Sequence, residues 1–129
     1  MNMQVRVPAF GKFLNHLKTA GVETESARGF WGGVTADGEI VVTAWIDQND
    51  GHGRFKIWRP LTNHGRLKEQ WEVGNIRVGT EVRLILLRQR GNVPSGKPGR
   101  QVAAAALMPG KWKVAELSRD GKSALVEPA

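Results

Sequence analysis

The sequence predicts a single α+β domain in which one N-terminal helix packs against a small curved sheet or open β-barrel. Apolar residues recur with a helical period only near the start of the chain, whereas short β-branched or alternating runs follow Phe30. The 129 residues contain no internal repeat and no linker long enough to separate two domains. Residues 1–129 are therefore expected to share one hydrophobic core.

The helix is predicted at residues 8–20. Four apolar residues have the i, i+3, i+4, i+7 spacing of one buried helical face: Phe10, Phe13, Leu14 and Leu17. Pro8 suits the first turn of a helix, and Gly21 suits the position after its C-cap. Both ends of the predicted helix are therefore marked in the sequence.

The remainder of the chain is predicted to be mainly strand and loop. Strands are expected at residues 30–34, 40–46, 55–58, 81–87, 112–117 and 124–127. The Asp37-Gly38 turn predicts that the first two form a hairpin. Residues 101–108 fit either a strand or a short helix, because alanine does not decide between them. Residues 62–71 are ambiguous, and residues 89–100 are predicted to be a flexible basic loop.

Residues 91–97 match the G-x-x-x-x-G-K skeleton of a phosphate-binding loop. However, Pro98 stands where such a loop has the Ser or Thr whose hydroxyl holds magnesium, and proline has no backbone N–H for a phosphate. The chain also lacks the alternating strand–helix pattern of such proteins. We therefore predict no nucleotide triphosphatase activity, and take this segment to be a turn-rich loop or a contact with a nucleic-acid backbone.

No other motif gives a credible catalytic or metal site. The chain has no cysteine, and its three histidines lack zinc-ligand spacing: His16, His52 and His64. Asp47, Asn49 and Asp50 resemble the start of a calcium loop, but Gly51 comes one residue early and the distal glutamate is missing. Asp47, Asp50 and His52 also fit a metal-dependent nuclease site, although a polar hairpin loop fits them better. We predict no enzymatic activity, no bound metal and no cofactor.

The formal net charge is +7, and the basic excess is concentrated in two stretches that contain 11 of the 19 lysines and arginines and no acidic residue. The first basic segment, residues 51–68, contains Arg54, Lys56, Arg59, Arg66 and Lys68. The second basic segment, residues 88–113, contains Arg88, Arg90, Lys97, Arg100, Lys111 and Lys113. If the fold brings the segments together, they form one cationic face suited to a polyanion; otherwise they are two solvated surfaces.

The five tryptophans and the absence of tyrosine are also informative. Most of the tryptophans are expected in the core, because each lies in or beside an apolar run: Trp31, Trp45, Trp58, Trp71 and Trp112. Trp58 lies between Lys56 and Arg59, and Trp112 lies between Lys111 and Lys113. Aromatic rings between cations suit base stacking beside phosphate neutralisation.

In four short motifs, this chain resembles short bacterial proteins related to HNH-type restriction endonucleases. The motifs are L-x-x-A-G-V from Leu17, W-G-x-V-x-x-D-G from Trp31, V-x-x-W-x-D from Val42 and I-x-x-G-x-x-V-x-L-I-L from Ile76. The resemblance covers residues 10–117, lacks the HNH metal-binding segment and departs at the basic residues 94–100. It implies a PUA-like module, a small β-barrel of a kind that can hold a modified base in an aromatic pocket, without the nuclease.

Together these features predict a nucleic-acid-binding module that recognises a modified base or a single-stranded segment, with DNA favoured over RNA. Trp31, Trp45 or Trp58 would line the pocket that holds the base. The cations expected to hold the backbone or form the basic surface are Arg54, Lys56, Arg59, Arg88, Arg90, Lys97, Arg100, Lys111 and Lys113.

The alternative is a protein-interaction domain or small inhibitor, whose charges would steer it to an acidic protein partner. No stretch approaches the roughly 18 apolar residues of a membrane span, and the first residues lack the apolar run of a secretory signal. A cytoplasmic protein without a membrane partner is therefore expected.

Overall fold

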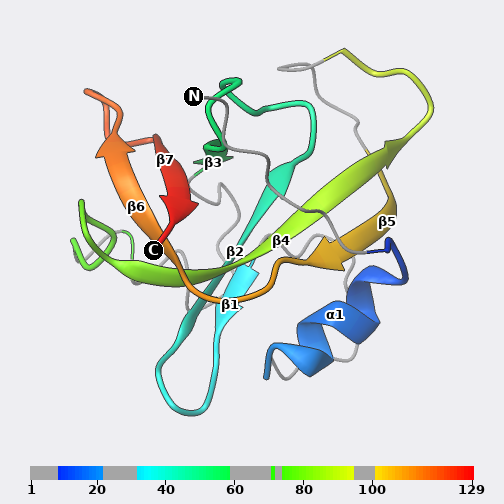
Figure 1. The fold of residues 1–129 in the computed structure, drawn as a ribbon, viewed down its shortest axis with the longest axis horizontal. Coiled ribbons are helices and arrows are strands. Elements are labelled where there is room, and N and C mark those ends of the chain that lie inside the picture. The colour runs from blue at the N-terminus through cyan, green and yellow to red at the C-terminus, as the bar shows by residue number, and fades with distance from the viewer. Residues whose placement is uncertain (1–8, 22–31, 59–70, 72–73, 95–100) are drawn as a thin grey trace.

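The computed structural model describes residues 9–21, 32–58, 71, 74–94 and 101–129, and in them seven strands form one mixed sheet (Figure 1). The elements are α1 (Phe13–Thr19), β1 (Gly32–Val34), β2 (Ile40–Trp45), β3 (Phe55–Trp58), β4 (Glu81–Arg90), β5 (Gln101–Leu107), β6 (Trp112–Leu117) and β7 (Ser123–Pro128).

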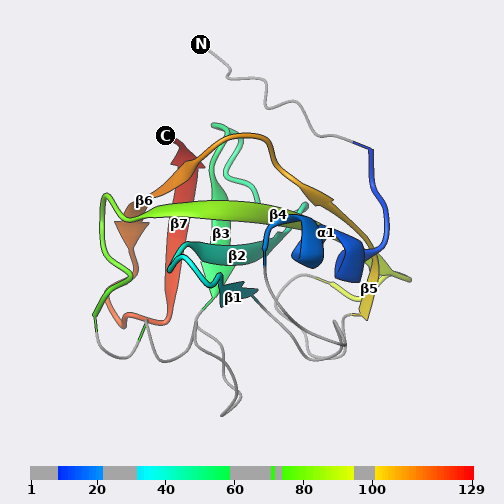
Figure 2. The same cartoon turned by 90° about the horizontal axis from the view of Figure 1, so that it is seen from below.

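The sheet is built around β4, its longest strand. The strand order is β1-β2-β4-β6-β7-β3, and β5 also pairs with β4. β2 runs parallel to β4, whereas β5 and β6 both run antiparallel to it: β5 pairs with the second half of β4 and β6 with its first two residues. Figures 1 and 2 show β5 and β6 at opposite ends of β4, with α1 beside β5.

The parallel pairing of β2 and β4 decides which loops meet. Ile40 lies opposite Val82 at one end of the pair, and Trp45 lies opposite Leu87 at the other. The backbone N–H of Ile46 continues the ladder by donating to the carbonyl of Leu87 over 2.9 Å. Because parallel strands end at the same edge, the loop after β2 and the β4–β5 hairpin lie at one end of the sheet.

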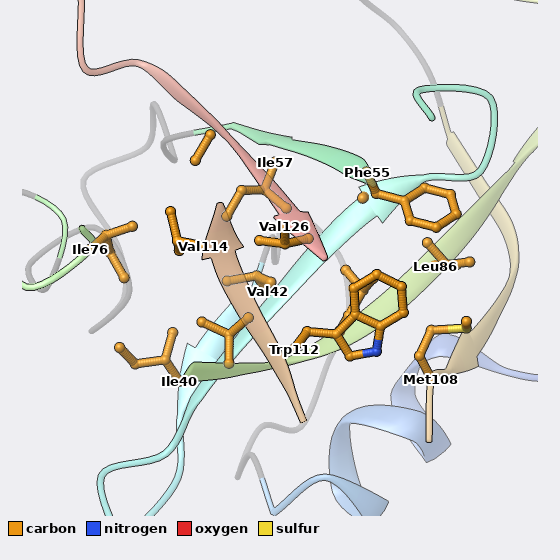
Figure 3. Packing of buried hydrophobic residues seen from close by; sticks show 14 of the residues in the cluster. Ile40, Val42, Phe55, Ile57, Ile76, Leu86, Met108, Trp112, Val114 and Val126 are labelled. Carbon is orange, nitrogen blue, oxygen red and sulfur yellow. The ribbon is translucent and has the colours of Figure 1, made fainter. Parts of the chain in front are cut away.

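The main core lies on the concave side of this sheet, where alternate residues of five strands meet. Figure 3 shows side chains from β2, β3, β4, β6 and β7 converging, with Trp112 among them. Trp112 is 2 % exposed, and its ring lies 5.9 Å from that of Phe55 at a tilt of 60°. Tilted packing of this kind is a favoured geometry for two aromatic rings. Its burial makes Trp112 part of the core.

A smaller apolar cluster lies on the opposite side of β2 and β4. It contains Phe13, Ala20, Val41, Trp45, Ile85, Leu87 and Ala105. Residues of the two clusters alternate along both strands, so these central strands are buried on both faces. Continuous apolar runs such as those at residues 40–46 and 84–87 are typical of strands in this position.

The predicted α+β class is wrong, because the described chain is mainly β. Its one helix has seven residues, too few to form a layer across the sheet. The helix begins at Phe13 because Gly11 is tied to β5 as a bridge: its N–H and carbonyl both bond to Ala105 over 2.8 Å. Lys12 provides no side-chain cap, and Pro8, the predicted first turn, lies outside the described residues.

Several predicted elements are confirmed. The first two strands form the β1–β2 hairpin, in which Gly38 adopts a φ of 84° that glycine accommodates without steric cost. Residues 101–108, which were compatible with strand or helix, form strand β5 over Gln101–Leu107. β4 extends to Arg90, three residues beyond the predicted strand. Of the ambiguous residues 62–71, only Trp71 is described.

Candidate functional site

Among the four tryptophans that the structure describes, only Trp58 is substantially exposed. Trp45, Trp71 and Trp112 are 8, 7 and 2 % exposed, whereas Trp58 is 47 % exposed. The indole N–H of Trp71 donates to the carbonyl of Gly121 over 2.7 Å, as a buried donor requires. Trp45 and Trp112 are therefore part of the two apolar clusters, as expected for most of the tryptophans, and neither presents an exposed ring. Trp31 lies outside the described residues.

Trp58 projects from the outer face of β3. Phe55 and Ile57 of this strand are buried in the core, so the alternation of the strand sends Lys56 and Trp58 to the opposite side. The Lys56 ammonium lies 4.2 Å from the centroid of the Trp58 ring, a cation–π contact. The indole N–H donates to Oε1 of Gln48 over 2.9 Å. We refer to Trp58, Lys56 and Gln48 as the Trp58 platform.

Gln48 is itself held by the backbone. Its N–H donates to the carbonyl of Trp45 over 2.9 Å, and its carbonyl accepts from the N–H of Lys56 over 3.0 Å. An isolated bridge between Asn49 and Phe55 completes the return of the chain from β2 to β3. These backbone bonds fix the position of the Gln48 side chain relative to the Trp58 ring. Gln48 was not predicted from the sequence, since its partner lies ten residues away in a different element.

The loop before β3 carries a compensated charge pair. Both Asp50 and Glu116 form ion pairs with Arg54. Partial burial raises the pKa of Asp50, but hydrogen bonds from the His52 N–H and from Arg54 outweigh it, so the pKa lies below its usual value of 3.8. The hydrogen bond to Asp50 also raises the pKa of Arg54. Arg54, predicted to hold a nucleic-acid backbone, is therefore already engaged by two carboxylates.

Lys111 and Lys113 also face carboxylates. The Lys111 ammonium lies 3.0 Å from Glu39, and Arg83 approaches the same carboxylate at 3.6 Å. Lys113 lies between Glu81 of β4 and Glu127 of β7 in the sheet register. The fold has thus placed acidic residues from other parts of the sequence beside two lysines that stand in an acid-free stretch of the chain, through antiparallel pairing in the case of Lys113. These two lysines contribute less positive potential than the sequence suggests.

The end of the β4–β5 hairpin is different. Arg88 and Arg90 are exposed, and their cross-strand partners, Ala104 and Gln101, are uncharged. The Arg88 guanidinium lies 4.2 Å from the centroid of the Phe10 ring. Within the described part of the chain, neither arginine forms an ion pair. The two side chains share one face of β4, since they stand two residues apart.

The loop after β2 links parts of the two basic segments. Gln48 follows Trp45, and Trp45 lies opposite Leu87, the residue before Arg88. The loop after β2 therefore connects the Trp58 platform with the end of β4. Trp58 itself pairs with Ser123 of β7, and Figure 1 shows β3 nearer to β7 than to the arrowhead of β4. The remaining predicted site residues, Arg59, Lys97 and Arg100, lie outside the described residues.

The loop that resembled a metal site contains ordinary turn contacts. The Asp50 carboxylate accepts the backbone N–H groups of His52 and Arg54 over 2.8 and 3.2 Å, and the Asn49 side chain accepts the N–H of Gly51 over 3.1 Å. Such side-chain-to-backbone bonds are typical of polar turns. Across the described residues, no three His, Cys, Asp or Glu side chains form a group that could hold a metal ion.

None of the helices in the described residues has the length and apolar character needed to cross a membrane. Comparison of this chain with protein-family models, with curated proteins and with solved structures gives no match.

Proposed function

We propose that the protein binds nucleic acid on the Trp58 platform and, across the loop after β2, toward the end of the sheet that carries the β4–β5 hairpin. The observation that carries this proposal is the indole of Trp58, which is 47 % exposed yet held on one side by Lys56 and at its N–H by Gln48. An aromatic ring that is fixed before a ligand arrives loses little conformational entropy on binding. Any base can stack on such a ring, because every base has an aromatic face.

The cations that surround this end of the sheet are suited to phosphate. Arg88 and Arg90 have neutral cross-strand neighbours, so a phosphate would not have to displace a carboxylate to reach them. The carboxylate of Asp50, in the loop between them and the platform, is already neutralised by Arg54. Arginine binds phosphate with two parallel hydrogen bonds, which positions the backbone as well as attracting it.

The proposed interface is smaller than the one predicted from the sequence. It keeps Lys56, Trp58, Arg88 and Arg90, and it omits the buried Trp45. It also omits the predicted cations that lie beside carboxylates: Arg54, Lys111 and Lys113.

The proposal can be tested by fluorescence anisotropy with labelled DNA and RNA oligonucleotides across a series of salt concentrations. Affinity should fall steeply between about 50 and about 200 mM salt, because binding to phosphates releases counterions. The double variant Arg88→Ala/Arg90→Ala should bind at least about tenfold more weakly at low salt. It should also lower the logarithmic salt slope by about 0.9 for each phosphate that is no longer neutralised on duplex DNA, or about 0.7 on a single strand.

A matched control is the double variant Arg77→Ala/Lys113→Ala, which removes the same charge at the opposite end of β4. Arg77 is exposed just before β4, and Lys113 pairs with the first residue of that strand. This variant should weaken binding by no more than about threefold, the effect of net charge alone. Equal weakening by the two double variants would contradict the proposed location. If the wild-type protein binds an acidic polypeptide but no nucleic acid at about 50 mM salt, the nucleic-acid proposal is wrong and a protein partner takes its place.

A further inference from the structure

We infer that the Trp58 platform takes a single unpaired base, so that the protein selects single-stranded nucleic acid over duplex. This inference rests on the proposed function and specifies its ligand. It follows from three features of the platform: which parts of the indole are covered, how the ring is oriented and what lies beside it.

The indole has one face available for stacking. The Lys56 ammonium lies over the ring at 4.2 Å from the centroid, so that face is occupied. Trp58 as a whole residue is nevertheless 47 % exposed, and we assign the ring face opposite Lys56 to the ligand. One aromatic face accommodates one base, and the arrangement resembles a stack on a platform rather than a cage closed on both sides.

A platform of this kind selects unpaired bases for a geometric reason. In a duplex, both faces of every internal base are covered by neighbouring base pairs, so a side chain can reach them only as a wedge inserted between steps. To act as a wedge, Trp58 would have to give up its contact with Lys56 and its hydrogen bond to Gln48, which disfavours that role. A base in a single strand can turn out of its stack at low cost and lie on the ring.

The neighbouring charges fit the same ligand. Lys56 lies beside the ring, so a phosphate flanking the stacked base could be neutralised without any rearrangement of the protein. Arg88 and Arg90, on the far side of the loop after β2, would bind phosphates further along the nucleic-acid strand. The ligand is therefore a short single-stranded segment with one base on Trp58 and its backbone directed toward the β4–β5 hairpin.

The test compares a single strand with a duplex of the same sequence, for the wild-type protein and for Trp58→Ala, Trp58→Phe and Gln48→Leu. The wild-type protein should bind the single strand at least about tenfold more tightly than the duplex. Trp58→Ala should lose about 5- to 150-fold of single-strand affinity, equivalent to roughly 1–3 kcal/mol of stacking, with little change in salt slope. Trp58→Phe should retain most of that affinity. Gln48→Leu should give an intermediate loss, because it removes the acceptor that orients the ring.

The control is Val78→Ala, which shortens another exposed apolar side chain, 63 % exposed, at the opposite end of β4. It should leave single-strand affinity within about twofold of the wild type, since Val78 is not part of the Trp58 platform. Thermal unfolding should be similar for all variants, because Trp58 and Val78 are both outside the core.

The results separate this inference from the proposed function. Equal affinity for single strand and duplex, or no effect of Trp58→Ala on a wild-type protein that binds both, would overturn the inference and leave nucleic-acid binding intact. Absence of binding to any nucleic acid would overturn the proposed function itself. A loss in Trp58→Ala that Val78→Ala reproduces would show a general effect of surface apolar area, and would also contradict the platform.

Discussion

The β6–β7–β3 half of the sheet and the β4–β5 hairpin both carry basic residues, yet these residues have opposite surroundings. In the first region, Arg54 forms ion pairs with Asp50 and Glu116, and Lys113 lies between two glutamates. In the hairpin, Arg88 and Arg90 lie across from alanine and glutamine. The difference comes from the partner strands, since these basic residues lie in the two acid-free stretches, residues 51–68 and 88–113.

An acid-free stretch of sequence is therefore not an acid-free surface. β7 places Glu127 opposite Lys113, and β6 supplies Glu116 to Arg54, from positions up to 62 residues away. In the hairpin, β4 is paired with the alanine-rich β5, which has no charge to contribute. The first region is close to electrically balanced, whereas the hairpin keeps its positive potential for a ligand.

The largest expected contrast between the regions is in stability. Trp112 is the first residue of β6, and its side chain lies in the main core. Trp112→Ala should lower the free energy of unfolding by about 3–5 kcal/mol, because it leaves a large cavity. Val102→Ala, in the hairpin, should cost about 1 kcal/mol or less, because Val102 is only partly buried. Urea unfolding of both variants measures the two values. Similar losses would mean that the hairpin is as integral to the core as β6, and binding data on hairpin variants would then need correction for unfolding.

A smaller effect is expected when a carboxylate is removed from the balanced region. Glu116→Gln releases one partner of Arg54 and should raise nucleic-acid affinity about twofold at low salt, because a nearby negative charge no longer repels phosphate. Asp37→Asn makes the same change in net charge at the exposed β1–β2 turn and serves as the control. If both substitutions raise affinity equally, only the net charge matters and the contrast between the regions has no bearing on binding.

The smallest effect concerns the Asp50–Arg54 pair. Because the folded state lowers the pKa of Asp50 below 3.8, its carboxylate adds stability above that pH and loses it as the pH falls through the lowered value. Asp50→Asn should therefore lower the melting temperature by at most about 5 °C at neutral pH. The difference from the wild type should disappear as the pH falls below 3.8. A constant difference down to about pH 2 would show that the turn hydrogen bonds, rather than the charge, carry the effect.

Local sequence predicted the strands well, because their signals are local. The β-branched run at residues 40–46 and the alternation at residues 55–58 each indicate a strand, and β2 and β3 formed there. The helix was predicted too long, because Gly11 forms a bridge with Ala105 and the helix begins only at Phe13. That bridge joins positions 94 residues apart, and no periodicity near residue 10 encodes it. The described chain is mainly β rather than α+β because seven strands share one sheet and the described helix has only seven residues.

The sequence alone determined which residues bear charge, which segments form strands and which residue types could stack on a base. It did not determine which tryptophan is exposed, because Trp45 and Trp58 both lie in or beside apolar runs, and burial depends on whether another element covers them. Tertiary structure decided that α1 and the sheet cover Trp45, whereas Trp58 stays on the surface beside Gln48. It also decided, through strand pairing, that Arg54 would be neutralised and that Arg88 and Arg90 would not. Exposure and charge balance are properties of spatial neighbours, and spatial neighbours are set by register and topology rather than by position along the chain.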